Sequence, residues 1–452
     1  MLTLNQLKSF YSNSPLWLQK LYAAIPYDLR TGVEYRKWKE FLQRELSNEE
    51  YTLLKLKETL LYAYENTDYY KEVFDTLDIS PHDVKTTKDF ALLPTIDKDT
   101  VKANFNRLRA RNFPKNRTFY VATGGTSGKP MTFLQSTNVW KKELAFNMNY
   151  FSKYGYHPSM LKASFRGGTF KNTPNIYWKY NPLYNEIHFS PFHINEDTIE
   201  HYVNRLNTLQ PLFFHSYPSS LLLLIHQIHN KGLSLNYSPK VIFLISENFT
   251  QKELHTIQSF FQSTVTSFYG HTERLIFAPN YSKDLSSYKI DGKYGFFELV
   301  DKNGHALHTN NVHGEMVGTS FDNFAMPLLR YKTNDHTHFI DYNNNIIAMV
   351  EGRWKQEYLS GKDGVKLYLT ALNVHTDIFK NVLQYQFHQK KSPCVELHII
   401  VTQEFTEADK HKILTTLEQR GGHAIIFSIK VVKQLQLTPR GKFKLVVNSK
   451  KV

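Results

Sequence analysis

The stretch that decides the fold reads Val121-Ala122-Thr123-Gly124-Gly125-Thr126-Ser127-Gly128-Lys129-Pro130. Its three glycines and three hydroxyl side chains between Thr123 and Gly128 cannot build a core, but their N–H and O–H donors can converge on one anion, as glycine-rich loops do around phosphates. Pro130 follows Lys129 where the P-loop of kinases and GTPases has Ser or Thr, so that class is disfavoured. An ordinary turn between two strands stays open as the alternative.

The sequence predicts a strand on each side of this loop, and the second one is Met131–Leu134, directly after it. A strand–loop–strand arrangement resembles a hairpin and differs from the strand–loop–helix of a Rossmann site. Capping signals and helical spacing predict helices nearby. We expect them over residues 47–66, from about Asp97, over 140–154, and over 221–230, the last capped by Ser219-Ser220. Residues 1–45 show no clear period, so no element is assigned to them.

Two later strands end in polar residues of the kind that form sites. Val241–Ile245 is a continuous apolar run, typical of a buried parallel strand, and Ser246-Glu247 follows it directly. Val265–Phe268 is followed by Tyr269-Gly270-His271-Thr272-Glu273. In open α/β sheets ligands bind beyond the carboxyl ends of the strands. A glycine permits close backbone approach, a hydroxyl can bond a phosphate, and a carboxylate can hold a divalent cation, so both stretches are candidate site residues.

The last hundred residues form a separate pattern. After the β-rich segments that end near Glu351, a strand is predicted over residues 395–401, a helix from Thr406 to Arg420, and a strand over 424–432. This β-α-β order is typical of a compact α+β unit. The expected fold is therefore α/β, with a large multilayer N-terminal domain (1–352) and a small α+β C-terminal domain (353–452).

Composition narrows the class of protein further. The net charge of +14 attracts polyanions, yet the basic residues are dispersed, so no nucleic-acid partner and at most peripheral membrane association are expected. The single Cys394, the lack of a signal-peptide pattern, and apolar runs well below the roughly 20 residues of a membrane span predict a cytoplasmic protein. No paired histidine spacing indicates zinc, and no nucleophile elbow indicates a serine hydrolase.

Five motifs together carry a resemblance. They are TGGTSGKP from Thr123, YGHTE from Tyr269, PLLRYKTND from Pro327, EGR from Glu351 and TPRGK from Thr438. In this order and spacing the chain resembles the acyl-adenylate-forming (ANL) superfamily, and within it the CapK/phenylacetate–CoA ligase branch. The segments from Tyr69 to Lys98 and from Gln356 to Asn373 are also similar to that branch, the second pointing to the CapK subgroup.

The resemblance implies roles for single residues. Thr123, Gly124, Gly125, Thr126, Ser127 and Gly128 would wrap the β- and γ-phosphates of ATP, and Thr272 would meet the α-phosphate. Glu273 would hold Mg²⁺, Ser246, Glu247, Tyr269 and Gly270 would border the adenine and acyl pocket, and Asp335 would bind the ribose. Arg353 would brace the nucleotide, Lys355 would lie at the hinge, and Lys442 of a mobile C-terminal domain would bridge carboxylate and α-phosphate. Structural roles stay open for Asp335, Lys355 and Lys442, and we expect His271 to be a bystander rather than a substrate contact.

The implied activity is ATP-dependent activation of a small carboxylic acid to an acyl-adenylate, with release of pyrophosphate and transfer to CoA or another thiol, or to an amine. The setting implied by the subgroup is bacterial surface-polysaccharide biosynthesis. Gly124, Asn334 and Lys355-Gln356 depart from the family pattern and weigh more against CoA thioesterification than against adenylation. AMP transfer as in coenzyme F390 synthetases, and a non-catalytic polyanion- or membrane-binding protein, are the alternatives. A homodimer is left open, as are the acid and the acceptor.

Overall fold

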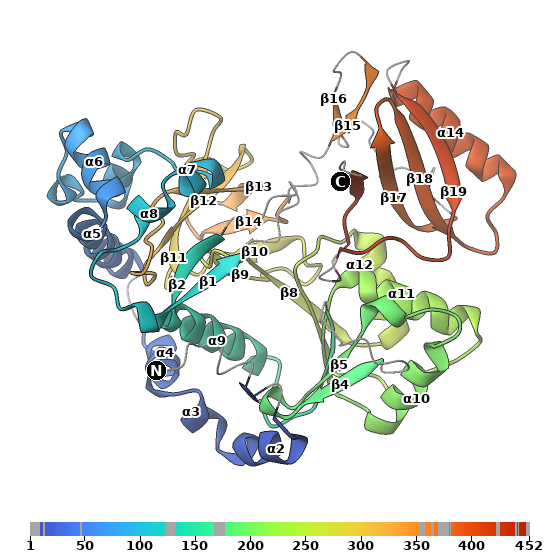
Figure 1. Ribbon diagram of the computed structural model, residues 1–452. Helices are drawn as coiled ribbons and strands as arrows, with labels where there is room; N and C mark the ends of the chain where they lie inside the picture. The colour runs from blue at the N-terminus through green and yellow to red at the C-terminus, as the bar shows by residue number, and fades with distance from the viewer. Residues whose placement is uncertain are drawn as a thin grey trace.

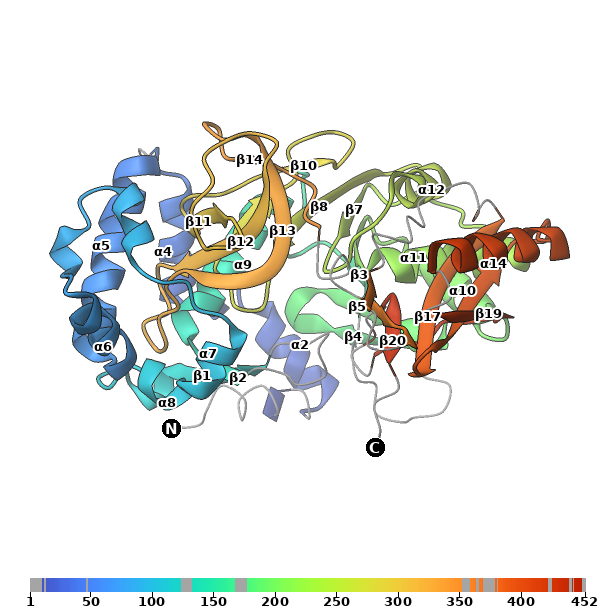
Figure 2. The same ribbon diagram turned by 90° about the horizontal axis from the view of Figure 1, so that it is seen from above.

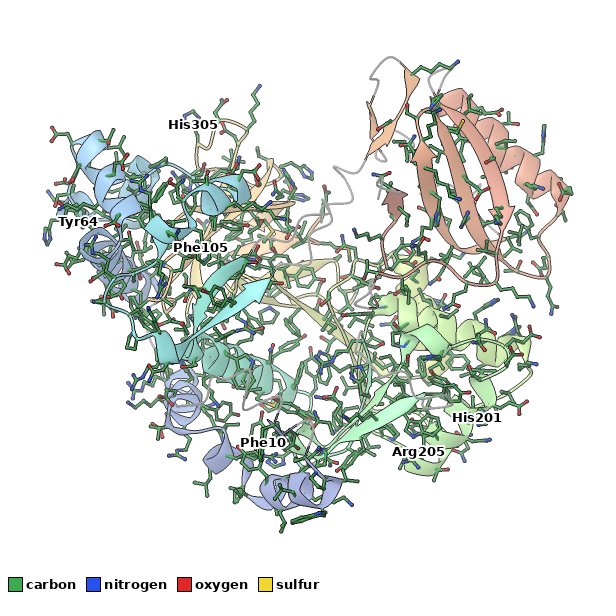
Figure 3. All side chains as sticks on the ribbon, in the orientation of Figure 1. Phe10, Tyr64, Phe105, His201, Arg205 and His305 are labelled. Carbon is green, nitrogen blue, oxygen red and sulfur yellow. The ribbon has the colours of Figure 1, made fainter. Side chains whose placement is uncertain are left out.

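The computed structural model describes residues 10–11, 14–45, 48–122, 132–166, 177–351, 358–362, 366–368, 379, 381–421, 425–438, 441 and 443–448. A large N-terminal unit holds three sheets, and a smaller C-terminal unit lies beside it (Figure 1). In Figure 3, Tyr64 on the large unit marks the side away from the small one, and His201 and Arg205 mark the helix α10 (Ile199–Leu209). No helix in the described ranges is long and apolar enough to cross a membrane.

A seven-stranded sheet forms the centre of the large unit. Its strand order is β4-β5-β3-β6-β7-β8-β9; the strands from β5 to β8 run parallel to one another, and the edge strands β4 and β9 are antiparallel. The bounds are β3 Lys162–Phe165, β4 Trp178–Asn181, β5 Glu186–Phe189, β6 Phe213–Ser216, β7 Val241–Leu244, β8 Thr264–Gly270 and β9 Phe277–Pro279. Parallel strands of this length are buried on both faces, and β7 is buried at every position.

Helices cover both faces of this sheet (Figure 2). On one face, α10, α11 (Pro218–Asn230) and α12 (Gln251–Phe261) enclose a hydrophobic core with Ile242 and Leu244. On the other face, α9 (Thr137–Ser152) packs Phe146, Tyr150 and Phe151 against Phe243. Because successive strand residues point to opposite faces, one short strand supplies both cores.

The predicted hairpin is present before α9. Strands β1 (Thr118–Ala122) and β2 (Thr132–Ser136) pair antiparallel on either side of the glycine-rich loop, whose residues 123–131 lie outside the described part. A five-stranded antiparallel sheet of order β10-β14-β13-β12-β11 stands next to it. Its strands are β10 Ser287–Lys289, β11 Gly295–Val300, β12 His313–Ser320, β13 Tyr331–Asp341 and β14 Ile346–Ala348. Helices α5 (Asn48–Asn66), α6 (Asp68–Leu77), α7 (Lys98–Ala103) and α8 (Phe105–Leu108) flank it.

The small unit is built on a four-stranded sheet of order β19-β18-β17-β20. The strands are β17 Val382–Lys391, β18 Cys394–Val401, β19 Ile426–Val431 and β20 Val446–Asn448, and α14 (Glu407–Gly421) packs on one face with Ile413 and Leu417 in the core. A separate ladder joins β15 (Tyr358–Ser360) to β16 (Lys366–Tyr368). The expected α/β class, with a large N-terminal and a small α+β C-terminal domain, is confirmed, whereas the boundary at 352/353 falls outside the described residues and stays a prediction.

Several local predictions were wrong. Helix α11 begins at Pro218, so Ser219 and Ser220 lie inside its first turn rather than capping it, because proline is well suited to the first helical position. Strand β8 continues through Tyr269 and Gly270, which the sequence placed after the strand. Residues 1–45, for which no element was assigned, contain α2 (Leu16–Ala24), α3 (Tyr27–Arg30) and α4 (Val33–Leu42).

The start of β11 requires a glycine. A Cβ on Gly295 would lie 2.1 Å from the backbone oxygen of Leu275, whereas a Cβ on the neighbouring Gly292 would meet only Thr52 Oγ1 at 3.8 Å. We expect Gly295→Ala to lower the free energy of unfolding of the large unit by about 1–3 kcal/mol, because the backbone must shift to relieve the overlap. Urea unfolding monitored by tryptophan fluorescence measures it, with Gly292→Ala as the matched control. Equal midpoints for both variants would contradict the packing described here.

Candidate active site

The carboxyl end of β8 is joined to the five-stranded sheet by a hydrogen bond. Tyr269 Oη donates to Asp335 Oδ2 at 2.8 Å, although the two residues are 66 positions apart in the chain. Burial, and next the Asp335 carboxylate, raise the pKa of the Tyr269 hydroxyl well above its ordinary value. The tyrosine therefore stays protonated and keeps its role as donor, which fixes the Asp335 carboxylate at this edge.

Asp335 is aimed by an irregularity in its own strand. The register of β12 against β13 shifts between Glu315 and Val317, and Asn334 adopts a left-handed backbone with φ of 59°. Asn334 N–H donates to Glu315 Oε1 at 3.0 Å, and Asp335 N–H donates to Thr333 Oγ1 at 3.1 Å. Bulges of this kind redirect a side chain, and asparagine tolerates positive φ better than most residues. Asn334 can therefore stand in for the glycine usual at this place.

Glu273 is the most deeply buried of the predicted site residues within the described part of the chain, with 3% of its surface exposed. Its Oε2 lies 3.1 Å from His271 Nδ1, and its Oε1 accepts from Tyr331 Oη at 3.2 Å. His271 Nε2 accepts from the N–H groups of Leu275 and Ile276, so the proton is on Nδ1 and points at Glu273. His271 thus orients the carboxylate, while Thr272 between them is exposed.

Gln135 on β2 is a positioning residue that the sequence analysis missed. Its side chain is fully buried, and Nε2 donates to the carbonyl oxygens of Thr272 and Glu273 at 2.9 and 3.3 Å. Its Oε1 accepts from Arg274 at 2.8 Å. One amide thus ties the hairpin of the glycine-rich loop to the Thr272-Glu273 backbone. A lone polar residue at the end of an apolar strand was the only signal available.

Ser246 and Glu247 follow β7 as predicted, but the two side chains have different surroundings. Ser246 is exposed and has φ of 62°. Glu247 Oε2 accepts from Ser219 N–H in the first turn of α11 at 3.2 Å, and Oε1 accepts from Phe443 N–H at 3.0 Å. A helix N-terminus favours a carboxylate. Glu247 therefore connects the large unit to the segment of the small unit that carries TPRGK.

The structure brings part of the predicted site together and does not describe the rest. Ser246, Glu247, Tyr269, Gly270, Thr272, Glu273 and Asp335 all lie at the ends of β7 and β8 or on the adjoining β13. Thr123, Gly124, Gly125, Thr126, Ser127, Gly128, Arg353, Lys355 and Lys442 fall outside the described residues. Among the residues that the structure describes, no group of three or more His, Cys, Asp or Glu side chains could hold a metal ion.

Comparison with known proteins agrees with the motifs. Residues 359–449 match the family model of the CapK C-terminal domain. Protein CapK of Staphylococcus aureus is 24% identical over 468 residues, covering 98% of this chain and 99% of that protein. The resemblance to the acyl-adenylate-forming superfamily, in its CapK and phenylacetate–CoA ligase branch, is confirmed. The phenylacetate–coenzyme A ligase of Escherichia coli (strain K12) is 22% identical over 340 residues, covering 71% of this chain and 72% of that enzyme.

Solved structures share the fold of this CapK-like chain. A 2-hydroxyisobutyryl-CoA ligase in the postadenylation state, in complex with R3-HIB-AMP, gives a TM-score of 0.66 at 13% identity and covers 88% of this chain and 89% of its own. The acyl acid amido synthetase AtGH3.15, in complex with 2,4-DB, gives 0.57 at 15% identity, with coverage of 85% and 86%. The division into a large and a small unit is thus that of adenylate-forming enzymes.

The Gln135 amide provides a test of the geometry around Glu273. We expect Gln135→Leu to lower the free energy of unfolding by about 1–3 kcal/mol, because two carbonyl oxygens and Arg274 lose their partner. Gln251→Leu, at an exposed glutamine that donates to the Asp284 carbonyl, is the matched control and is expected to have little effect. Chemical denaturation of both variants measures the difference. Similar losses in the two would show that Gln135 does not tie these segments together.

Proposed function

We propose that this protein activates a carboxylic acid with ATP and transfers the acyl group to a thiol or an amine. In the first step a carboxylate oxygen attacks the α-phosphorus of ATP, the bond to the β-phosphate breaks, and pyrophosphate leaves with its electron pair. In the second step the acceptor attacks the carbonyl carbon of the acyl-adenylate, AMP leaves, and the acceptor loses a proton. Nothing is oxidised or reduced in either step.

The observation that carries this proposal is a pair of oriented carboxylates at one edge. Asp335 accepts from Tyr269, and Glu273 is held by His271 and Tyr331. The Tyr269–Asp335 bond holds a carboxylate where two ribose hydroxyls would need an acceptor, and Gly270 leaves room for close approach of a ligand. Thr272 offers its exposed hydroxyl to a phosphate. The glycine-rich loop between β1 and β2 would add backbone donors for the β- and γ-phosphates, because Gln135 ties the following strand to Thr272.

Glu273 fits a hard divalent cation, since its carboxylate offers the oxygen ligands that Mg²⁺ prefers and His271 and Tyr331 fix its orientation. When bound, Mg²⁺ would neutralise phosphate charge. The attack joins two anions, so the residues at this edge must also supply positive charge and hydrogen-bond donors.

The small unit would supply that positive charge. Phe443 N–H bonds to Glu247, which supports the role that the resemblance implies for Lys442, the preceding residue in the sequence. We assign Lys442 to the α-phosphate and the attacking carboxylate, Arg353 to the nucleotide, and Lys355 to the hinge, with the domain boundary at 352/353. Closure of the small unit would also keep water from the acyl-adenylate.

The acceptor is CoA, another thiol or an amine, and the likeness to both a CoA ligase and an amido synthetase supports either. The resemblance to CapK favours a setting in bacterial surface-polysaccharide biosynthesis. ATP–pyrophosphate exchange with a panel of carboxylic acids tests the proposal. Acid-dependent exchange supports adenylation. ATP binding without exchange favours AMP transfer to another substrate, and absence of ATP binding overturns the proposal in favour of a non-catalytic protein.

We expect Lys442→Ala to lower the rate of adenylation by about 10²–10³-fold, because one donor to the developing charge is lost from the transition state. ATP affinity should change little, since the lysine acts mainly on the reacting groups. Lys444→Ala, two residues further along the same segment, is the control. Single-turnover formation of acyl-AMP measures the rate, and a wild-type rate in Lys442→Ala would remove this lysine from the mechanism.

We expect Asp335→Ala to weaken ATP binding by about 10–100-fold, because hydrogen bonds to a charged group are lost. Asp341→Ala on the same strand, where the carboxylate bonds only to the local Asn344 turn in the described part, is the matched control. Equilibrium dialysis with ATP gives both affinities. An unchanged affinity would make Asp335 a structural partner of Tyr269 and not a ligand of the ribose.

A further inference from the structure

A second group of charged side chains lies on the same seven-stranded sheet, on and directly after strands β3 and β5. Glu186 on β5 is buried, with 3% of its surface exposed. Arg166, directly after β3, donates to Glu186 Oε1 at 3.0 Å and to Oε2 at 3.4 Å, and Lys162 Nζ lies 3.7 Å from Oε2. Two cations thus face one carboxylate.

This group carries more positive charge than is needed to neutralise Glu186. Burial alone would raise the pKa of Glu186, but Arg166 and Lys162 hold it well below its ordinary value, so the carboxylate is ionised. One positive charge is left over, while a buried structural ion pair needs only one cation for each carboxylate. The side chain of Arg166 is 36% exposed, whereas those of Lys162 and Glu186 are 6% and 4% exposed. The accessible member of the group is therefore the arginine.

Polar groups continue from Arg166 along the same face. Arg166 Nε donates to Ser164 Oγ at 3.0 Å, and this hydroxyl lies 3.3 Å from His188 Nδ1. His215 on β6, which pairs with Ser164, is 8% exposed, and neither of its ring nitrogens has a hydrogen-bond partner in the described part of the chain. Buried polar atoms are nearly always bonded, so an unpartnered imidazole beside a surplus cation indicates a ligand with oxygen atoms.

This group is placed to meet the far end of an acid activated at the candidate active site. Strands β3, β6, β7 and β8 are parallel and adjacent, so Arg166 after β3 lies at the same edge as Ser246 after β7 and Gly270 at the end of β8. Three strand spacings, about 14 Å, separate β3 from β8. Along the face of the sheet between β8 and β3, the side chains are first Phe243, which packs on α9, then His215, and finally Arg166.

We propose that Arg166, together with His215 and Ser164, binds the distal end of the acid, and that this acid is oxygen-rich there: a hydroxylated or dicarboxylic acid, with a sugar acid as the best fit, rather than an aryl or alkyl acid. This inference rests on the proposed adenylation, because it assigns the other end of the same substrate. Arg166 then acts in substrate specificity and takes no part in bond breaking.

Pairs of acids matched in size test the assignment on the full-length protein. Glucuronate is compared with cyclohexanecarboxylate, and glutarate with pentanoate, by ATP–pyrophosphate exchange. The oxygen-rich member of each pair is expected to give the higher kcat/KM by about 10²-fold or more, because buried donors reject a ligand that leaves them unpaired. Equal or better exchange with the apolar acids overturns this inference while the proposed adenylation stands.

A single variant keeps the test free of a stranded charge. Arg166→Met removes the guanidinium and leaves Lys162 Nζ paired one to one with the Glu186 carboxylate. It is expected to raise KM for the oxygen-rich acid about 10–100-fold, with a smaller change in kcat and no loss with the apolar acids. Arg205→Met is the control, because Arg205 on α10 lies over the Trp178 ring at 5.6 Å. A loss shared by all acids would mark a purely structural role and overturn the assignment.

A binding measurement separates failure of this inference from failure of the proposed function. Thermal shift with glucuronate or glutarate, without ATP, is expected to stabilise the wild-type protein and Arg205→Met, and not Arg166→Met. Such a shift without any exchange overturns adenylation and supports the binding site. Absence of both the shift and exchange with oxygen-rich acids overturns the inference.

Discussion

The parallel pairing of four short strands is the constraint on which the rest of this molecule depends. Parallel strands point their carboxyl ends the same way, so β3, β6, β7 and β8 deliver the residues that follow them to one edge of the sheet. The apolar residues of these strands pack on both faces, against α9 and against α10–α12. The polar residues of the candidate site therefore lie at the carboxyl ends of the strands or directly after them.

Several carboxylates lie at the edge where the proposed nucleotide would bind, and each of them accepts hydrogen bonds. Asp335 accepts from Tyr269, Glu273 from His271 and Tyr331, and Glu247 from two backbone N–H groups. Such bonds fix where every negative charge points before any ligand arrives. Preorganised groups of this kind do not have to rearrange during the reaction. Electrostatic stabilisation of the transition state by such groups is usually the largest contribution to enzyme catalysis.

The sequence was informative where the signal was local. An apolar run followed by Ser246-Glu247, and a second followed by Tyr269–Glu273, indicated candidate site residues, because the ends of strands are readable from a few residues. The contact between Tyr269 and Asp335, and that of Gln135 with Thr272, join distant segments, and no spacing reveals them. Helix α2 was missed because its pattern is inverted: Gln19 is its buried residue, whereas Trp17 and Leu21 are 63% and 60% exposed. Without an inward apolar stripe, periodicity has nothing to detect.

The carboxylate of Glu247 also influences the fraction of molecules in which the small unit is docked on the large unit. It accepts from the first turn of α11 and from Phe443, so withdrawal of the small unit would break the bond to Phe443 and leave the bond to α11. A hydrogen bond to a charged group contributes about 1.5–3 kcal/mol. That free energy corresponds to about a 10- to 150-fold change in the ratio of docked to undocked molecules, which is the range of typical allosteric coupling. A single side chain therefore tunes the fraction of molecules in which the two units are docked.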